Sequence, residues 1–146
     1  MTPQQIALVK SSFSLVQPIA TAAASMFYDH LFKADPGLKP LFTGDMVHQG
    51  ARLMSMIGMA VGMLDRPAAL VPQLRLMGVR HRGYGVQERD YATVGSALLL
   101  TLQQGLGEAF TQEVREAWTA LYGLISFNMI DAARVPEAAI PVSETA

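Results

Sequence analysis

The stretch 70–86, LVPQLRLMGVRHRGYGV, places one histidine at the end of an apolar stripe. Four of its residues recur at spacings of four, three and four and therefore share one face of a predicted helix: Leu70, Leu74, Met77 and His81. A neutral imidazole in an apolar setting can donate its lone pair to a metal ion. The same position also suits a core histidine whose ring makes one hydrogen bond, and the stretch by itself leaves both interpretations open.

Proline and glycine set the expected bounds of the helix that carries His81. Pro72 is expected to open it, because the fixed φ of proline suits the first turn and its missing N–H would have no partner there. Gly83 and Gly85 are expected to end it. Three cationic side chains fall outside the apolar face and are expected on the solvent side: Arg75, Arg80 and Arg82.

The composition limits the chemistry that is open to the chain. With 146 residues it is long enough for one domain with a substantial core. The absence of cysteine excludes disulfides, thiolate metal sites and thioether attachment of a cofactor. The 11 basic and 12 acidic residues form no dense basic run, which argues against nucleic acid or an acidic membrane surface as a partner. A content of 51% hydrophobic and 16% charged residues instead predicts an interface or a large apolar ligand.

Neither a secretory signal nor a membrane span is predicted. The N-terminal residues MTPQQIALVKSSF are amphipathic, without a charged segment followed by an uninterrupted apolar core. The longest apolar runs, such as 56–64, are far shorter than the ~20 residues that cross a bilayer. We therefore expect a cytoplasmic protein that does not associate with membranes.

Helical periodicity recurs along the chain, and no segment alternates convincingly with period two. Thr2, Pro3 and Gln5 have the pattern of a capped helix start, and Pro18 is expected to end that first helix. We expect an all-α domain of about seven helices over residues 1–134, followed by a flexible tail at 135–146. Besides the first helix and the His81 helix, the expected helical segments are 18–32, 36–42, 46–64, 89–104 and 112–129.

Short pieces spread over nearly the whole chain follow a characteristic order: FYDHLF at 27–32, LF at 41–42, RHRGYGV at 80–86, DYATVG at 90–95, FTQE at 110–113 and AWTALYG at 117–123. Their order and spacing resemble the globin family, in particular the bacterial single-domain haemoglobins and the haem domains of flavohaemoglobins. The resemblance implies a globin fold packed around a pocket for haem b, which is held without a covalent bond.

The resemblance assigns roles on the proximal side of this pocket. His81 matches the proximal histidine that binds iron through Nε2, and its other ring N–H is expected to bond the carbonyl of Met77, one turn back. Tyr91 matches a proximal tyrosine of the flavohaemoglobin branch, and Val86 follows His81 in a matched segment and is included among the haem contacts. Phe42 matches the phenylalanine that stacks on the porphyrin.

On the opposite side the resemblance implies a distal pocket formed by Tyr28, Gln49 and Leu53. A tyrosine hydroxyl and a glutamine amide can both donate to the negative charge that builds up on O2 when it binds ferrous iron. Leu53 gives the pocket an apolar wall, and Met56 and Met77 lie on the two predicted haem faces. The alternative is that the hydroxyl of Tyr28 is satisfied locally.

The remaining histidines are expected outside the pocket. His48 is turned about 100° from Gln49 around the helix and is expected to face solvent, with a sixth iron ligand as the alternative. His30 is expected to be a structural or surface residue. Arg52 either faces solvent or reaches a haem propionate.

One position departs from the flavohaemoglobin pattern. That pattern carries a glutamate in the last helix that bonds the proximal tyrosine, and the corresponding position here is Ala133. We therefore expect a moderate electron push from the proximal histidine, which favours ligand binding over oxidative activation.

The resemblance implies a haem protein that binds O2 reversibly for storage, delivery or sensing. The alternative is an NO dioxygenase that converts NO and O2 to nitrate and needs a separate reductase as its partner. A globin-shaped interaction module without haem is a third class.

Overall fold

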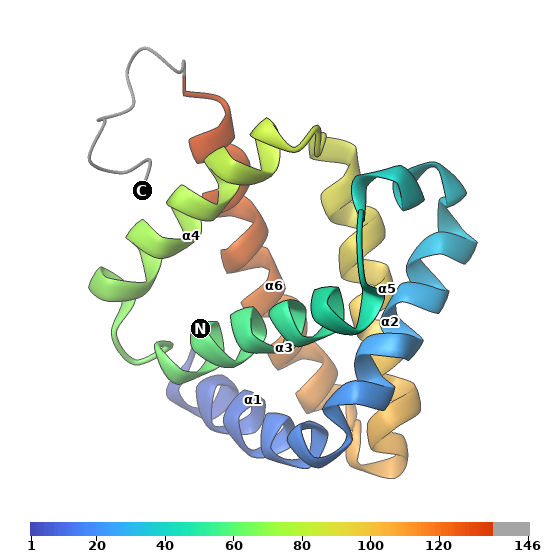
Figure 1. The fold of residues 1–146 in the computed structure, drawn as a ribbon. Coiled ribbons are helices and arrows are strands. Elements are labelled where there is room, and N and C mark those ends of the chain that lie inside the picture. Colours follow the sequence, from blue (N-terminus) through green and yellow to red (C-terminus); the bar gives the residue numbers. More distant parts are fainter. Residues whose placement is uncertain (136–146) are drawn as a thin grey trace.

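The computed structural model describes residues 1–135, and they form helices joined by short links (Figure 1). The α-helices are α1 (Pro3–Val16), α2 (Ala20–Ala34), α3 (Met46–Gly62), α4 (Pro67–Gly83), α5 (Glu88–Leu106) and α6 (Gln112–Ala133). The 3₁₀ segments are η1 (Gln17–Ile19), η2 (Pro36–Leu41) and η3 (Gly107–Ala109). Residues 1–135 contain no strand, which confirms the all-α prediction, and the helix count agrees with about seven. Of the predicted tail 135–146, only Val135 lies within the described residues.

The first and last helices begin where the sequence predicts. The Thr2 hydroxyl accepts from the Gln5 N–H at 3.1 Å, and the Gln5 side chain accepts from the Thr2 N–H at 3.0 Å, which forms a capping box. The Thr111 hydroxyl accepts from the Val114 N–H at 3.2 Å and caps α6 in the same way.

The apolar stretch Pro3–Ala34 is long enough, by length and composition only, to cross a membrane. In the structure η1 divides it into α1 of 14 residues and α2 of 15 residues. Each of these helices is about 20 Å long, shorter than the ~30 Å hydrocarbon core of a bilayer. Their large buried side chains, such as Val9 of α1 and Leu31 of α2, belong to the hydrophobic core. In the structure this stretch is therefore two helices, each of which buries some of its apolar side chains in the core.

The helix that carries His81 begins earlier than predicted. α4 starts at Pro67, and Pro72 lies inside it. Pro67 occupies the first helical turn, where proline is well tolerated, and Leu70 is only 1% exposed. Burial of Leu70 favours the earlier start, while Pro72 removes only the hydrogen bond to Ala68, close to the helix end. The prediction that Pro72 opens this helix was wrong, whereas the predicted end at Gly83 is confirmed.

α4 and α6 approach closely where a glycine faces the neighbouring helix. A Cβ built on Gly78 of α4 would overlap the backbone carbonyl of Met129 in α6, so this contact requires glycine. Figure 1 shows the two helices crossing. Nearer the start of α6, the buried Trp118 donates from Nε1 to the Ser12 hydroxyl of α1 at 2.8 Å. α6 therefore fixes the relative positions of α1 and α4.

Candidate functional site

A cavity of about 620 Å³ lies between α2, α3, α4, α5 and α6. A volume in this range suits a small-molecule or cofactor site. The fold brings to its wall every residue that the sequence assigns to the haem pocket: Tyr28, Phe42, Gln49, Leu53, Met56, Met77, His81, Val86 and Tyr91.

His81 lies near the end of α4 with its side chain in the cavity wall. Its Nδ1 is 2.7 Å from the carbonyl oxygen of Met77, the partner that the sequence predicts. A carbonyl oxygen can only accept, so Nδ1 carries the proton and the neutral ring keeps its lone pair on Nε2. Burial lowers the pKa of His81, and the opposing effect of the Met77 carbonyl is smaller, so the neutral form is favoured. The imidazole can therefore donate a lone pair to a metal ion in the cavity.

The chain turns sharply just after His81. Gly85 has φ +94°, a left-handed value that favours glycine. The Val86 N–H donates to the His81 carbonyl at 3.0 Å, and the Gly85 N–H donates to the Arg82 carbonyl at 3.0 Å. These two bonds form the Schellman pattern of a helix end, and they bring Val86 to the cavity wall.

The two predicted distal donors both have partners in the main chain. The Tyr28 hydroxyl donates to the Gln49 carbonyl at 3.1 Å, and the Gln49 side-chain amide donates to the Thr43 carbonyl at 3.0 Å. The alternative in which Tyr28 is satisfied locally therefore describes the structure as it stands. Burial raises the pKa of Tyr28 to about 12, so its hydroxyl remains a donor at neutral pH.

Three aromatic rings pack together on the Tyr28 side of the cavity. Phe42 lies edge-on to Tyr28, with ring centroids 5.3 Å apart and 69° between the planes. Phe42 also lies edge-on to Phe32 at 5.5 Å, and Tyr28 stacks on Phe32 at 5.8 Å. Phe42 is thus held in the cavity wall by two other rings. The stacking of Phe42 on a porphyrin stays a prediction.

A further tyrosine, Tyr122 of α6, lines the cavity and was not among the predicted site residues. Its hydroxyl donates to the Tyr91 carbonyl at 2.5 Å, which joins α6 to the start of α5. A Cβ on Gly95 would lie 2.7 Å from the Tyr122 ring, so this glycine makes room for it. Burial raises the pKa of Tyr91 to about 12 and raises the pKa of Tyr122 further. Tyr122 lies in the expected helix 112–129, and its position in the sequence gave no sign of this hydrogen bond.

The sequence predicts Arg80 and Arg82 of α4 on the solvent side, and the structure gives both of them further contacts. Arg80 is exposed but also lines the cavity, and Arg82 is half-buried and donates to the carbonyl of Ala133 at 2.7 Å. The exposure of Arg80 agrees with the prediction, whereas the prediction was wrong for Arg82, because a long side chain can reach groups beyond its own helix face. Ala133 itself has no side-chain acceptor, and it contributes only a main-chain carbonyl to this region.

The other predicted positions lie as follows. Arg52 is exposed and lines the cavity, whereas His48 is exposed and is absent from the cavity wall. His30 Nε2 pairs with Gln104 Oε1 at 2.7 Å, which agrees with a structural histidine. The remaining lining residues that were not predicted include three with polar groups, Thr43, Tyr84 and Asp90. The others are apolar and come from α2, η2, α5 and α6: Phe27, Leu31, Leu38, Leu41, Val94, Ile125 and Met129.

The cavity wall fits a haem. A haem is a flat apolar ring that carries one iron and a pair of carboxylates. The mostly apolar and aromatic wall matches the ring, and the Nε2 lone pair of His81 matches the iron. The guanidinium groups of Arg52 and Arg80 have the charge to match the carboxylates.

Comparison with curated proteins finds flavohemoproteins among the relatives. The flavohemoprotein of Vibrio cholerae is 32% identical over 136 residues, which are 90% of this chain and 34% of that protein. The flavohemoprotein of Bordetella parapertussis is 30% identical over 142 residues, 95% of this chain and 35% of that protein. The chain thus spans about a third of the length of these relatives.

Solved structures of similar fold include a bacterial globin from Campylobacter jejuni, with a TM-score of 0.79 and 25% identity over 91% of this chain and 96% of that one. A hexacoordinated heme protein from an anhydrobiotic tardigrade has a TM-score of 0.84 at 17% identity, over 92% of this chain and 96% of that one, and shows the fold alone. A family model described as Globin matches residues 25–129. These matches imply a haem cofactor. The chain belongs to the globin family.

Proposed function

We propose that the protein binds haem b without a covalent bond and binds O2 reversibly, for storage, delivery or sensing in the cytoplasm. The observation that carries the proposal is the His81 imidazole in the cavity wall, whose Nδ1 donates to Met77 and whose Nε2 is left with the lone pair. His81 is the proposed iron ligand. The family match and the flavohemoprotein relatives support a haem in this cavity.

The side chains around the cavity have separate tasks in this proposal. A bound haem supplies a ferrous iron that binds small gases. Tyr28 exchanges its 3.1 Å hydrogen bond to the Gln49 carbonyl for one to the ligand, and Gln49 donates to the ligand from its side-chain NH2, which has a second N–H besides the one bonded to Thr43 at 3.0 Å. Leu53 and Met56 keep the α3 side of the cavity apolar and exclude water. Ligand retention then depends on a competition between the ligand and the Gln49 carbonyl for the single donor of Tyr28.

A second candidate is NO dioxygenation, and the similarity to flavohemoproteins favours it. In this reaction NO and O2 combine with one electron to give nitrate. A separate reductase supplies the electron in this proposal. The same cavity residues serve both candidates, because O2 must first be held in the pocket in either case.

An absorption spectrum tests whether the protein carries haem at His81. We expect an intense Soret band in the purified protein and loss of haem, or a changed band, in His81→Gly. His48→Gly is the matched control, because His48 is exposed and outside the cavity wall. Absence of the band in the wild type would favour a globin-shaped module without haem, and a band that is identical in His81→Gly would contradict the ligand assignment.

Turnover separates the two candidate functions. Reversible oxygenation, with no consumption of NO beyond one molecule per haem, supports the O2-binding protein. Sustained formation of nitrate from NO and O2, with a purified cellular reductase and NADH, supports the dioxygenase. The same assay without reductase gives the background of a single turnover per haem.

A further inference from the structure

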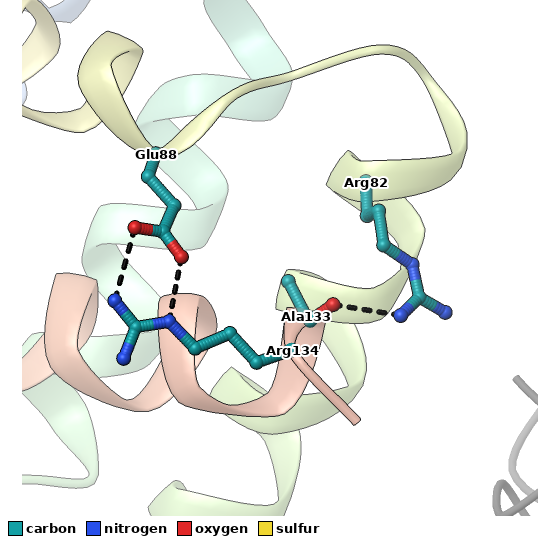
Figure 2. Close-up of polar contacts among 4 residues, drawn as sticks. All are labelled: Arg82, Glu88, Ala133 and Arg134. Atoms are coloured by element: carbon teal, nitrogen blue, oxygen red, sulfur yellow. Dashed lines mark hydrogen bonds and ion pairs between the residues drawn. The ribbon is translucent and has the colours of Figure 1, made fainter. Parts of the chain in front are cut away.

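The link between α4 and α5, residues 84–87, lies between two arginine contacts to the end of α6 (Figure 2). On the α4 side, Arg82 Nη1 donates to the carbonyl oxygens of Ala133 at 2.7 Å and Val135 at 2.6 Å. These carbonyls lie at the C-terminal end of α6, where the last carbonyl groups have no N–H partner within the helix. A cation is favourable at that end of a helix. Arg82 therefore caps α6 from the neighbouring helix.

The Arg82 guanidinium is partly withdrawn from water. Its Nη2 is buried and has no hydrogen-bond partner among residues 1–135. Contacts of a buried charge are screened by salt far less than those of an exposed one. The tie from Arg82 to α6 is thus expected to persist at high ionic strength.

On the α5 side, Arg134 forms a bidentate ion pair with Glu88. Arg134 Nε lies 2.6 Å from Glu88 Oε1, and Nη2 lies 3.0 Å from Oε2. The two side chains are 65% and 53% exposed, so salt screens this pair. Residues 133–135 consequently hold the end of α4 by a half-buried contact and the start of α5 by an exposed one.

His81 lies between two fixed points on α4. Three residues before it, Gly78 rests against the backbone of Met129 in α6. Directly after it, Arg82 bonds the end of the same helix. Because the ring bonds the Met77 carbonyl of its own helix, its direction follows the path of the last turn of α4.

We infer that Arg82 is a positioning residue for His81. Through its bonds to the carbonyls of Ala133 and Val135, Arg82 fixes the last turn of α4 and so sets the direction in which Nε2 is offered to the iron. Together with the Arg134–Glu88 pair, these bonds form what we call the clamp, and the Arg134–Glu88 pair is its salt-sensitive part. The inference rests on the proposed binding of haem iron by His81.

The test measures the iron–histidine stretching band of the ferrous holoprotein by resonance Raman and the rate of haem transfer to an excess of apomyoglobin. Arg82→Met keeps the apolar stem and removes the donors, and we expect a shifted or broadened band and haem loss about tenfold faster. Arg82→Lys retains a cation and is expected to restore part of both readouts.

Arg75→Met is the matched control for the loss of an arginine tie. It removes the Arg75–Asp131 ion pair of 2.7 Å, which joins the same two helices, α4 and α6, without involving Arg82 or the link 84–87. We expect an unchanged iron–histidine band and a rate of haem transfer within about twofold of the wild type, because exposed ion pairs contribute little. A change in Arg75→Met as large as that in Arg82→Met would overturn the inference, because any α4–α6 tie would then serve.

The outcomes separate the clamp from the function on which it rests. An unchanged band and unchanged haem loss in folded Arg82→Met overturn the clamp while the wild-type band still supports His81 as ligand. Absence of that band in the wild type contradicts the ligand assignment itself. If Arg82→Met does not fold, Glu88→Gln decides: we expect faster haem loss than in the wild type at low salt and no difference at high salt, and equal rates at low salt overturn the inference.

Discussion

The hydroxyl of Tyr28 donates to the backbone carbonyl of Gln49 at 3.1 Å, while the side chain of Gln49 turns to the carbonyl of Thr43 at 3.0 Å. The two residues with the chemistry to stabilise bound O2 are therefore linked to each other through the main chain of α3. A hydrogen bond from Tyr28 to a ligand must replace the bond to the Gln49 carbonyl, whereas the Gln49 amide carries a second N–H besides the one that it donates to Thr43.

Removal of the Tyr28 donor is expected to speed O2 release. A hydrogen bond to a group that carries charge contributes about 1.5–3 kcal/mol, so Tyr28→Phe should raise the O2 dissociation rate by about 10- to 100-fold. Gln49→Leu should raise it less if Tyr28 is the main donor. Stopped-flow measurement of O2 release checks both variants, and equal rates in wild type and both variants would show that neither residue donates to the ligand.

Gly78→Ala is expected to destabilise the protein. The added Cβ would overlap the backbone carbonyl of Met129, so α4 and α6 must separate, at a loss of about 3 kcal/mol. Gly123→Ala in α6 is the matched control, because a Cβ there meets nothing within 4 Å and alanine favours a helix by about 0.5–1 kcal/mol. Urea unfolding should place the two variants on opposite sides of the wild type, and equal midpoints would argue against the close helix contact.

Loss of the Tyr122 hydroxyl is expected to weaken the proximal side of the cavity. Tyr122→Phe removes the hydrogen bond of 2.5 Å to the Tyr91 carbonyl, which keeps its acceptor role within α5, and a hydrogen bond of this kind contributes about 0.5–1.5 kcal/mol. Tyr84→Phe serves as the control, because Tyr84 is 67% exposed. Chemical unfolding of the two variants measures the difference in the free energy of unfolding. If Tyr122→Phe is as stable as Tyr84→Phe, the hydrogen bond of Tyr122 does not stabilise the protein.

The exposed ion pair at the end of α6 predicts a dependence of stability on acid. The Arg134 guanidinium holds the pKa of Glu88 below its ordinary value of 4.5. The unfolded chain therefore binds the proton first, so the stabilising effect is complete above about pH 4.5 and is lost as pH falls through the lowered pKa. Thermal midpoints of wild type and Glu88→Gln should differ at neutral pH and converge as the pH falls below the lowered pKa of Glu88. A gap that persists in acid would mean that Glu88 stabilises the protein by something other than its charge.

Helical periodicity predicts the local arrangement of His81 and Met77 well. The spacing of Met77 and His81, one turn apart, determines both their shared face and the bond from Nδ1 to the carbonyl. Tyr28, Gln49 and Tyr91 are far apart in the chain, and only the ordered resemblance to a globin placed them around one cavity. Their roles toward a ligand stay predictions.

The errors and omissions have a common physical cause, since each depends on contacts between segments. Pro72 was expected to open a helix on local propensity, but burial of Leu70 extended the helix to Pro67. Arg82 and Tyr122 donate to main-chain carbonyls. Because every residue carries such a carbonyl, no pattern of side chains predicts these partners. Sequence patterns locate faces well, whereas hydrogen bonds from side chain to distant backbone emerge only in the folded chain.

The bond between His81 Nδ1 and the main chain at Met77 has a consequence for mutational robustness. Because the acceptor is a peptide oxygen, any residue other than proline that continues the helix at position 77 supplies the same acceptor. The thioether of Met77, in contrast, faces the cavity and can be exchanged. Position 77 is therefore where the shape and selectivity of the pocket can be redesigned, or can drift in evolution, while the proton on His81 stays where it is.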